Sequence, residues 1–362
     1  MCLVYLSPVP WASFAQRPHK FVEWFHKCTG RSIVWVDTYP TRFPQLNDFM
    51  RVGKDTKANH SIPSWLTILT PHALPIEPLP GSGWLNRWLW RGQMKALTLL
   101  REQAPLVVIG KPSVLALQVL KTLKPDHSVY DCMDDFSAFY SGLSRKSMKH
   151  RELQLASDVS EVWASSSMLN DRWQRKGLKV RQVPNALDAD LLPKRNTAKM
   201  EAERKTFGYV GTMGPWFDWA WVVALAEVRS KDVIRLIGPV FGSVPDLPRN
   251  VQLLPPCNHE SALRAMLDFD VGLIPFKINK LTASVDPIKY YEYRALGLPL
   301  ISTCFGEMRF RVDEPGSFIC SNIDDITHIA AAAVSFEHHA SLLSEFVRNN
   351  TWERRFQATG LV

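Results

Sequence analysis

The sequence predicts an α/β protein built from two domains, and three observations support this prediction. The chain has 362 residues, and a domain usually holds about 100–200 residues. In the second half, short apolar segments alternate with segments of helical character, which is typical of a parallel sheet covered on both faces. Charge is divided unevenly, because residues 1–190 carry 24 Lys+Arg and 16 Asp+Glu, a net charge of +8, whereas residues 191–362 carry 19 of each.

The expected elements of the second half follow one another in a regular order. The segment 287–296 is expected to be a helix, because Pro287 stands at its start and Gly297 follows its end. Further helices are expected at 219–229 and 259–267. The expected strands are 207–213, 233–239, 251–254, 270–276 and 299–303.

The first half alternates less clearly, and long helical segments separate its expected strands. A polar stretch at 191–200 is interpreted as the linker between the domains. The first domain is therefore expected to span 1–190. Its expected strands are 3–6, 32–36, 106–109, 128–130, 161–164 and 180–183.

Several classes of protein are disfavoured by composition. The six cysteines form no CxxC pair, which suits a reducing compartment and argues against a zinc or redox motif. No secretory signal and no apolar run of about 18–20 residues is visible, so a cytoplasmic protein is expected, with peripheral membrane contact left open. Nucleic acid is not an expected partner, because no DNA- or RNA-binding motif accompanies the basic charge.

A glycine-containing loop is the first candidate for chemistry. Gly211 ends an expected strand, Gly214 follows, and a helix begins near Asp218. Glycines let backbone N–H groups approach a phosphate, and a helix N-terminus adds more N–H groups. The spacing is neither GxGxxG nor a P-loop, so an ordinary tight turn remains an alternative.

The second candidate is the helix that follows Asp286. Lys289 and Glu292 are three residues apart and share one face of this helix. An ammonium and a carboxylate there suit the diphosphate and the ribose hydroxyls of a nucleotide. The alternative is a solvated surface ion pair.

Several segments, in this order, resemble bacterial glycosyltransferases of the GT-B fold. The resemblance is closest to the family-4-like group that builds exopolysaccharide, teichuronic acid and similar surface glycans, including its glucuronosyltransferases. It spans nearly the whole chain, and the 281–303 block is its most specific part. The segments are SPVPWASFAQRPHKF (7–21), VYDCMDDFSAFY (129–140), VPNALD (183–188), YVGTMGPWFDW (209–219), LIGPV (236–240), FDVGLIPF (269–276), LTASVDPIKYYEYRALGLPLIST (281–303) and NTWERR (350–355).

This resemblance implies two Rossmann-like domains whose parallel sheets face one another across a cleft. It implies an acceptor domain at 1–190, a nucleotide-sugar donor domain at 191–345, and a last segment, 346–362, that crosses back to the first domain. No metal and no cofactor is expected, since the nucleotide-sugar is a substrate. The implied donor-binding residues are Gly211, Thr212, Met213, Pro239, Val240, Leu254, Ser284, Lys289, Tyr290 and Glu292.

Two positions depart from the family pattern. Many members have a second glutamate eight residues before the conserved one, where this chain has Ser284. Many also have Arg and Lys after the glycine loop, where this chain has 215–218, Pro-Trp-Phe-Asp. Both departures put a retaining mechanism in doubt.

Three aspartates form the candidate catalytic group. Asp131, Asp134 and Asp135 follow an expected strand of the first domain. An inverting transferase needs a carboxylate to take the proton of the acceptor hydroxyl, and clustered carboxylates raise one another's pKa. A metal-binding acidic pair and a helix cap are the alternatives, and the sequence does not choose among the three residues.

Two further segments of the first half are candidates for contact with the acceptor or a membrane. In the loop 8–20, Trp11 suits stacking on a sugar, while Arg17 and His19 suit an acceptor phosphate. The alternative is that these side chains cap and pack the first helix. In 84–95, three tryptophans alternate with basic residues, which indicates an interfacial helix on an anionic membrane or a core-facing helix with a basic outer side. The remaining histidines are interpreted as surface residues.

The predicted function is transfer of a sugar, hexosyl or glucuronosyl, from a nucleotide-diphosphate donor, with UDP favoured. The acceptor is expected to be a glycan or lipid-linked hydroxyl in surface polysaccharide biosynthesis. Two alternatives remain open, a nucleotide-sugar epimerase and a non-catalytic nucleotide-sugar-binding partner of another transferase.

Overall fold

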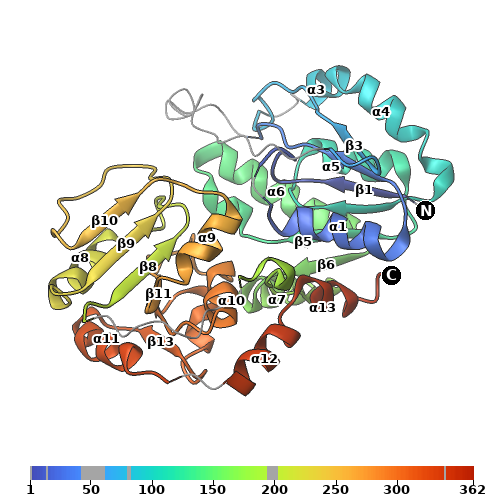
Figure 1. Cartoon of the computed structure of the whole chain (residues 1–362). Coiled ribbons are helices and arrows are strands. Elements are labelled where there is room, and N and C mark those ends of the chain that lie inside the picture. Colours follow the sequence, from blue (N-terminus) through green and yellow to red (C-terminus); the bar gives the residue numbers. More distant parts are fainter. Residues whose placement is uncertain (1, 14, 42–61, 80–82, 194–202, 338–339) are drawn as a thin grey trace. The chain divides into compact units, whose positions relative to one another are not determined.

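The computed structural model describes residues 2–13, 15–41, 62–79, 83–193, 203–337 and 340–362. The chain divides into two compact units. The first holds residues 1–184 and 356–362, and the second holds residues 185–355. Their boundary falls at Pro184, within the VPNALD segment, whereas the sequence placed it after residue 190. Figure 1 shows the helices and strands of each unit.

The first unit is built on a seven-stranded, all-parallel sheet in the order β3-β2-β1-β4-β5-β6-β7. Its strands β1 and β4 are apolar and fully buried, as in a sheet covered on both faces. The strands are β1 (Leu3–Leu6), β2 (Ile33–Val36), β3 (Leu66–Leu69), β4 (Leu106–Ile109), β5 (Ser128–Cys132), β6 (Glu161–Ala164) and β7 (Val180–Gln182). The helices are α1 (Arg17–Thr29), α3 (Gly83–Leu89), α4 (Arg91–Thr98), α5 (Val114–Leu123), α6 (Gly142–Asp158) and α7 (Ser167–Gln174).

The second unit holds a six-stranded, all-parallel sheet in the order β10-β9-β8-β11-β12-β13. The strands are β8 (Thr206–Val210), β9 (Val233–Ile237), β10 (Val251–Leu254), β11 (Val271–Ile274), β12 (Leu300–Thr303) and β13 (Ser317–Cys320). The helices are α8 (Trp219–Val228), α9 (His259–Met266), α10 (Ile288–Ala295), α11 (Ile326–Val334) and α12 (Ala340–Asn349). Helix α13 (Trp352–Gln357) begins in this unit and ends in the first. The predicted α/β fold with two parallel sheets is thereby confirmed.

Two strands were not expected from the sequence, β3 and β13. Both lie at the edge of their sheets, and each is four residues long. An edge strand pairs on one side only and is often short and partly exposed, as β3 is after Leu66. Such segments lack the continuous apolar run that identified the inner strands.

The end of the chain packs within the first unit. The ring of Phe356, in α13, lies 5.2 Å from that of Phe21 and 5.5 Å from that of Trp24, between ring centroids. Arg181 of β7 also donates a hydrogen bond to the carbonyl of Ala358. The preceding helix α12 instead packs Phe346 against tyrosines of α10 in the second unit.

Strand order locates the point in each sheet where a ligand is expected. Successive strands run outward from β1 to β3 in the first unit and from β8 to β10 in the second, and the chain then returns to the other side of the starting strand. The order therefore reverses between β1 and β4, and between β8 and β11. Open parallel sheets bind ligands outside the carboxyl ends of the strands at such a reversal.

Among the described residues, no helix is long and apolar enough to cross a membrane. No group of three or more His, Cys, Asp or Glu side chains within the described ranges is placed to hold a metal ion.

Candidate functional site

In the second unit, the site begins where β8 and β9 end. The N–H of Gly211, which follows β8, donates a hydrogen bond to the carbonyl of Ile237 at 2.9 Å. Gly238 follows β9 with a φ of +141°, and a Cβ at this position would lie 2.1 Å from the Gly211 oxygen. The two strand ends therefore approach so closely that a side chain at Gly238 would collide with the backbone.

The loop after Gly211 is held by backbone hydrogen bonds on both sides. The N–H of Met213 donates to the Pro239 carbonyl at 2.9 Å, and the N–H of Lys277 donates to the Trp216 carbonyl at 2.7 Å. The Asp218 carboxylate then caps α8 by accepting from the N–H of Trp221. Met213 is fully buried, and its carbonyl accepts a hydrogen bond from the N–H of Phe241 at 2.9 Å. Both backbone groups of Met213 are therefore already paired, which argues against direct contact of this predicted donor residue with a ligand.

A charged network lies on α10. Lys289 Nζ lies 2.6 Å from Glu292 Oε2, and His259 Nε2, at the start of α9, lies 2.8 Å from Glu292 Oε1. Glu292 is only 3% exposed. Burial by itself would raise the pKa of Glu292, but the Lys289 ammonium and the His259 hydrogen bond outweigh it and lower that pKa to about 2. Glu292 is therefore a fixed anion at neutral pH.

His259 is a member of this site that the sequence did not reveal. It was interpreted as a surface residue, and its side chain is 30% exposed, but it is also bonded to Glu292, 33 positions away in the sequence. Its other ring nitrogen, Nδ1, is buried and has no hydrogen-bond partner among the described residues. No local spacing connects α9 to α10, so only the tertiary structure shows the pair. The histidines at 338 and 339, also expected at the surface, lie outside the described residues.

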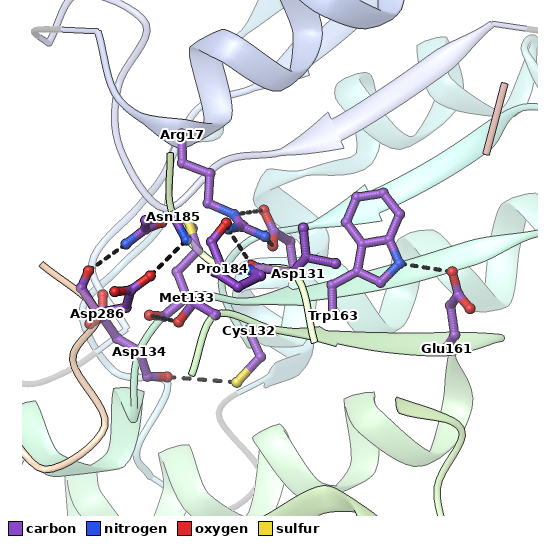
Figure 2. A network of polar contacts seen from close by, with 12 residues as sticks. Arg17, Asp131, Cys132, Met133, Asp134, Glu161, Trp163, Pro184, Asn185 and Asp286 are labelled. Carbon is purple, nitrogen blue, oxygen red and sulfur yellow. Dashed lines mark hydrogen bonds and ion pairs between the residues drawn. The ribbon is translucent and has the colours of Figure 1, made fainter. Parts of the chain in front are cut away.

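Ser284 lies in the loop before α10 and is 3% exposed. Its hydroxyl oxygen is buried and has no partner among the described residues. Asp286, two residues further on, is paired with Arg311 at 2.7 Å. It also accepts a hydrogen bond from the N–H of Asn185 at 2.8 Å (Figure 2). A rigid loop thus holds an unsatisfied hydroxyl.

Three predicted donor residues have contrasting surroundings. The Tyr290 ring is buried against the Arg311 guanidinium, whose Cζ lies 3.5 Å from the ring centroid, and its hydroxyl donates to Glu314. This side chain packs the core of the unit, which argues against direct contact with a ligand. Leu254, at the end of β10, is exposed, and Val240 is half-buried beside the Gly211 loop.

Thr212 and Pro239 contribute backbone groups. The carbonyl of Thr212 accepts a hydrogen bond from the Tyr209 hydroxyl. Thr212 and Pro239 are both half-buried.

In the first unit, Asp131 is part of a buried ion pair. Arg17 Nη2 lies 2.7 Å from Asp131 Oδ1, and the two side chains are 2% and 1% exposed (Figure 2). Arg17 also donates to the carbonyls of Val183 and Pro184 at 2.8 and 3.3 Å. Arg17 and Asp131 therefore join the start of α1 to β5 and to the residues that follow β7. The geometry argues against the predicted roles of Asp131 as a base and Arg17 as an acceptor ligand.

Asp134 and Asp135 differ sharply. Asp135 Oδ1 accepts from the N–H and hydroxyl of Ser137 and lies 3.2 Å from Arg172 Nη1, so this carboxylate caps a helical turn, as the alternative proposed. Asp134 is half-buried, and its carboxylate has no hydrogen bond among the described residues. Burial and the neighbouring Asp135 charge raise the pKa of Asp134 to about 7. Of the three aspartates, Asp134 has the properties of a base near neutral pH.

The loop from Pro8 to Lys20 favours the packing alternative. Trp11 and His19 are 5% and 1% exposed. His19 Nδ1 accepts from the N–H of Gln16, and its Nε2 lies 3.1 Å from the Trp11 carbonyl. Both rings also pack on Trp35. These side chains cap and pack α1, so they are not displayed for an acceptor.

Lys111 is a residue near the strand reversal of the first unit that the sequence did not single out. It follows β4, and its ammonium donates to the Thr38 hydroxyl at 3.1 Å and the Tyr39 carbonyl at 3.2 Å. The preceding Gly110 passes so close to Pro8 that a Cβ would lie 2.6 Å from the proline ring. The sequence feature that could have identified Lys111 is its position two residues after an apolar strand.

Comparison with known proteins agrees with this architecture. No protein-family model matches the chain. Sucrose-phosphate synthase from Thermosynechococcus elongatus superposes with a TM-score of 0.68 at 14% identity, covering 99% of this chain and 97% of that one. The lipopolysaccharide outer core galactosyltransferase WaaB superposes with a TM-score of 0.61 at 12% identity, covering 99% and 98%. The chain therefore has the GT-B fold of glycosyltransferases.

One curated protein is similar in sequence. The putative teichuronic acid biosynthesis glycosyltransferase TuaH of Bacillus subtilis (strain 168) is 25% identical over 201 residues. The match spans 49% of this chain and half the length of that relative. The predicted resemblance to GT-B glycosyltransferases of this kind is thus confirmed as a distant one.

Proposed function

We propose that this protein is a glycosyltransferase that moves a sugar from a nucleotide-diphosphate donor to a hydroxyl of a glycan or lipid-linked acceptor. The buried Glu292 with its two partners, at the end of a GT-B parallel sheet, carries this proposal. A carboxylate kept ionised in a buried site is suited to accept hydrogen bonds from a ribose diol. The release assay described below distinguishes a hexosyl donor from a glucuronosyl donor.

The second unit supplies the donor site. The turn at Gly211 and the backbone N–H of Thr212 border the position for the diphosphate, and Lys289 adds positive charge. The Lys289 ammonium has three N–H donors, one of which reaches Glu292, and the side chain is 21% exposed. Pro239, Val240 and Leu254 would line the nucleobase, and Ser284 would offer its unsatisfied hydroxyl to the donor. A solved trehalose-6-phosphate enzyme of E. coli with this fold binds UDP-2-fluoroglucose, which supports UDP as the carrier.

The first unit supplies the base. Asp134 takes the proton from the acceptor hydroxyl as the oxygen of that hydroxyl forms a bond to the anomeric carbon of the donor sugar. The bond from that carbon to the diphosphate oxygen breaks, and its electron pair leaves with the nucleoside diphosphate. A pKa of about 7 leaves a large fraction of Asp134 deprotonated at neutral pH. The donor site and the base are built from this chain's own side chains, and we propose that the reaction needs no metal ion.

The similarity to a teichuronic acid glycosyltransferase supports a role in surface polysaccharide biosynthesis. We place the reaction in the cytoplasm, at the inner face of the membrane, with residues 84–95 meeting an anionic surface. Trp84 and Trp88 are 68% and 57% exposed there, which favours the interfacial alternative for this segment.

Release of nucleoside diphosphate tests the proposal. Wild type is incubated with UDP-glucose, UDP-glucuronate or GDP-mannose, with and without a bacterial lipid extract as the source of acceptor. We expect release from one donor that depends on the extract and falls at least about 100-fold in Asp134→Asn, the usual effect of losing a general base. Asp126→Asn, an exposed site in the same unit, is the matched control.

Conversion of the donor without any acceptor would favour an epimerase. Nucleotide binding without turnover of any donor would favour a non-catalytic partner.

A further inference from the structure

A groove of about 850 Å³ lies on the first unit, lined by residues of α3, α5 and α6. It is separate in sequence from the aspartates and from the donor residues. Its described lining residues include four permanent cations and one carboxylate. The charged and titratable side chains are Arg87, Lys121, Lys146, His150, Arg151 and Asp158.

The positive charge of the groove is largely uncompensated. Lys121 and Lys146 are exposed, and neither forms an ion pair with another described residue. Arg151 is anchored, because its Nε lies 3.3 Å from Glu77 Oε1 and its Nη2 donates to the Glu77 carbonyl at 2.9 Å. An anchored guanidinium that lines the same groove as two exposed ammonium groups is suited to a phosphate group.

The same groove offers an acceptor for hydroxyl groups. Gln118 lines it, and the side-chain oxygen of Gln118 is buried without a hydrogen-bond partner among the described residues. A ligand that carries both a phosphate and hydroxyls would satisfy the lysines and this amide together.

Apolar side chains surround the groove. Leu79 and Leu143 line it and are both exposed. On α3, Gly83 and Arg87 face the groove, so the exposed Trp84 and Trp88 lie on the adjoining face of the same helix, four residues apart. Exposed tryptophans beside basic residues are typical of a protein face that meets lipid headgroups.

We propose that this face docks on an anionic bilayer and that the α3-α5-α6 groove holds the phosphate and hydroxyls of an anionic phospholipid headgroup. The tryptophans of α3 lie at headgroup level, and Lys121, Lys146 and Arg151 bind the phosphate. The inference rests on the membrane contact of the proposed function and assigns the headgroup phosphate to three cations outside 84–95.

Co-sedimentation of the full chain with vesicles tests this site. The vesicles contain equal parts of phosphatidylglycerol and phosphatidylcholine, with phosphatidylcholine alone as the neutral comparison. Each lysine near an anionic surface contributes about fivefold to partitioning. We expect Lys121→Gln/Lys146→Gln to weaken binding about 30-fold. The control Arg175→Gln/Lys176→Gln removes the same charge from exposed positions at the end of α7 and should change binding by less than about twofold.

Three results would overturn the inference. The first is equally weak binding of wild type to both vesicle types. The second is equal loss of binding in the two double variants, which would mean general charge attraction. Mixed-sequence single-stranded DNA that displaces the protein from vesicles and binds less well to Lys121→Gln/Lys146→Gln would assign the groove to nucleic acid.

A parallel titration of UDP into the same samples separates this inference from the proposed function. A circular dichroism spectrum and melting curve of Lys121→Gln/Lys146→Gln that match wild type show that the variant is folded. Vesicle binding without nucleotide binding would refute the proposed donor site alone. Nucleotide binding without vesicle binding would refute the headgroup site alone.

Discussion

Removal of the Lys289 charge should destabilise the second unit through Glu292. Lys289 Nζ and Glu292 Oε2 are 2.6 Å apart, and the carboxylate is 3% exposed. Lys289→Met keeps the length of the side chain but leaves this buried carboxylate with His259 as its remaining polar partner in the network. Breaking one partner of a buried ion pair leaves the other charge uncompensated, which is strongly destabilising.

The magnitude follows from the pKa of Glu292. Its value falls from an ordinary 4.5 to about 2 in the folded protein, and each unit corresponds to about 1.4 kcal/mol. The network thus stabilises the ionised fold by about 3 kcal/mol. Because the folded pKa is the lower one, this stability is fully present above pH 4.5 and is lost as the pH falls toward 2.

Urea unfolding at pH 7 measures the effect. We expect Lys289→Met to lower the free energy of unfolding of the second unit by about 3 kcal/mol. Lys289→Met/Glu292→Gln should recover at least about 1 kcal/mol of this loss, because the uncompensated charge is gone. A cost below about 0.5 kcal/mol for Lys289→Met, or strictly additive effects in the double variant, would refute the argument that Lys289 compensates a buried charge.

Three further predictions concern the first unit and the glycine loop. The kcat/KM of wild type should rise with pH and level off above about 7, because Asp134, whose pKa is about 7, accepts a proton only when ionised; a pH-rate profile measures this. Arg17→Met should lower the free energy of unfolding by about 3–5 kcal/mol, since it leaves Asp131 buried without its ion-pair partner; Arg17→Met/Asp131→Leu should cost less in the same denaturation experiment. Gly238→Ala should weaken nucleotide binding more than Gly242→Ala in calorimetry, because both have positive φ but only the first would place a Cβ 2.1 Å from a backbone oxygen.

Each of these predictions has a contradictory outcome. A profile unchanged between pH 5 and 9 would exclude Asp134 as the titrating base. Equal stability of Arg17→Met and wild type would show that the Asp131 carboxylate is hydrated rather than paired. Equal effects of the two alanine substitutions would mean that the close approach at Gly238 does not shape the binding loop.

The inner strands of both sheets were predictable from sequence because their apolar runs have one physical explanation. The inner strands β1, β4 and β6 begin and end where the sequence placed them, and so does the edge strand β10. A run buried on both faces is apolar at every position, and few other structures require this. β3 and β13 were not predicted because an edge strand pairs on one side only and needs fewer apolar residues.

The candidate site was only partly predictable. Lys289 and Glu292 were found because they are three residues apart on one helix, and this spacing places two side chains on the same face. His259 was missed because its bond to Glu292 depends on the packing of α9 beside α10. Arg17 and Asp131, 114 residues apart, looked like separate functional groups until the fold joined them in one buried pair.

The most direct test of the account is calorimetric titration of UDP, GDP, UDP-glucose and UDP-glucuronate into wild type, Glu292→Ala and Glu260→Ala. Glu260 is an exposed glutamate on α9, paired with Arg264 at the surface, and serves as the matched control. We predict micromolar binding of one nucleotide series to wild type and Glu260→Ala, weakened about 10–100-fold in Glu292→Ala by loss of hydrogen bonds to a charged group. Binding by Glu292→Ala as tight as wild type, or no binding of any nucleotide to wild type, would contradict the central claim that Glu292 holds a nucleotide-sugar donor.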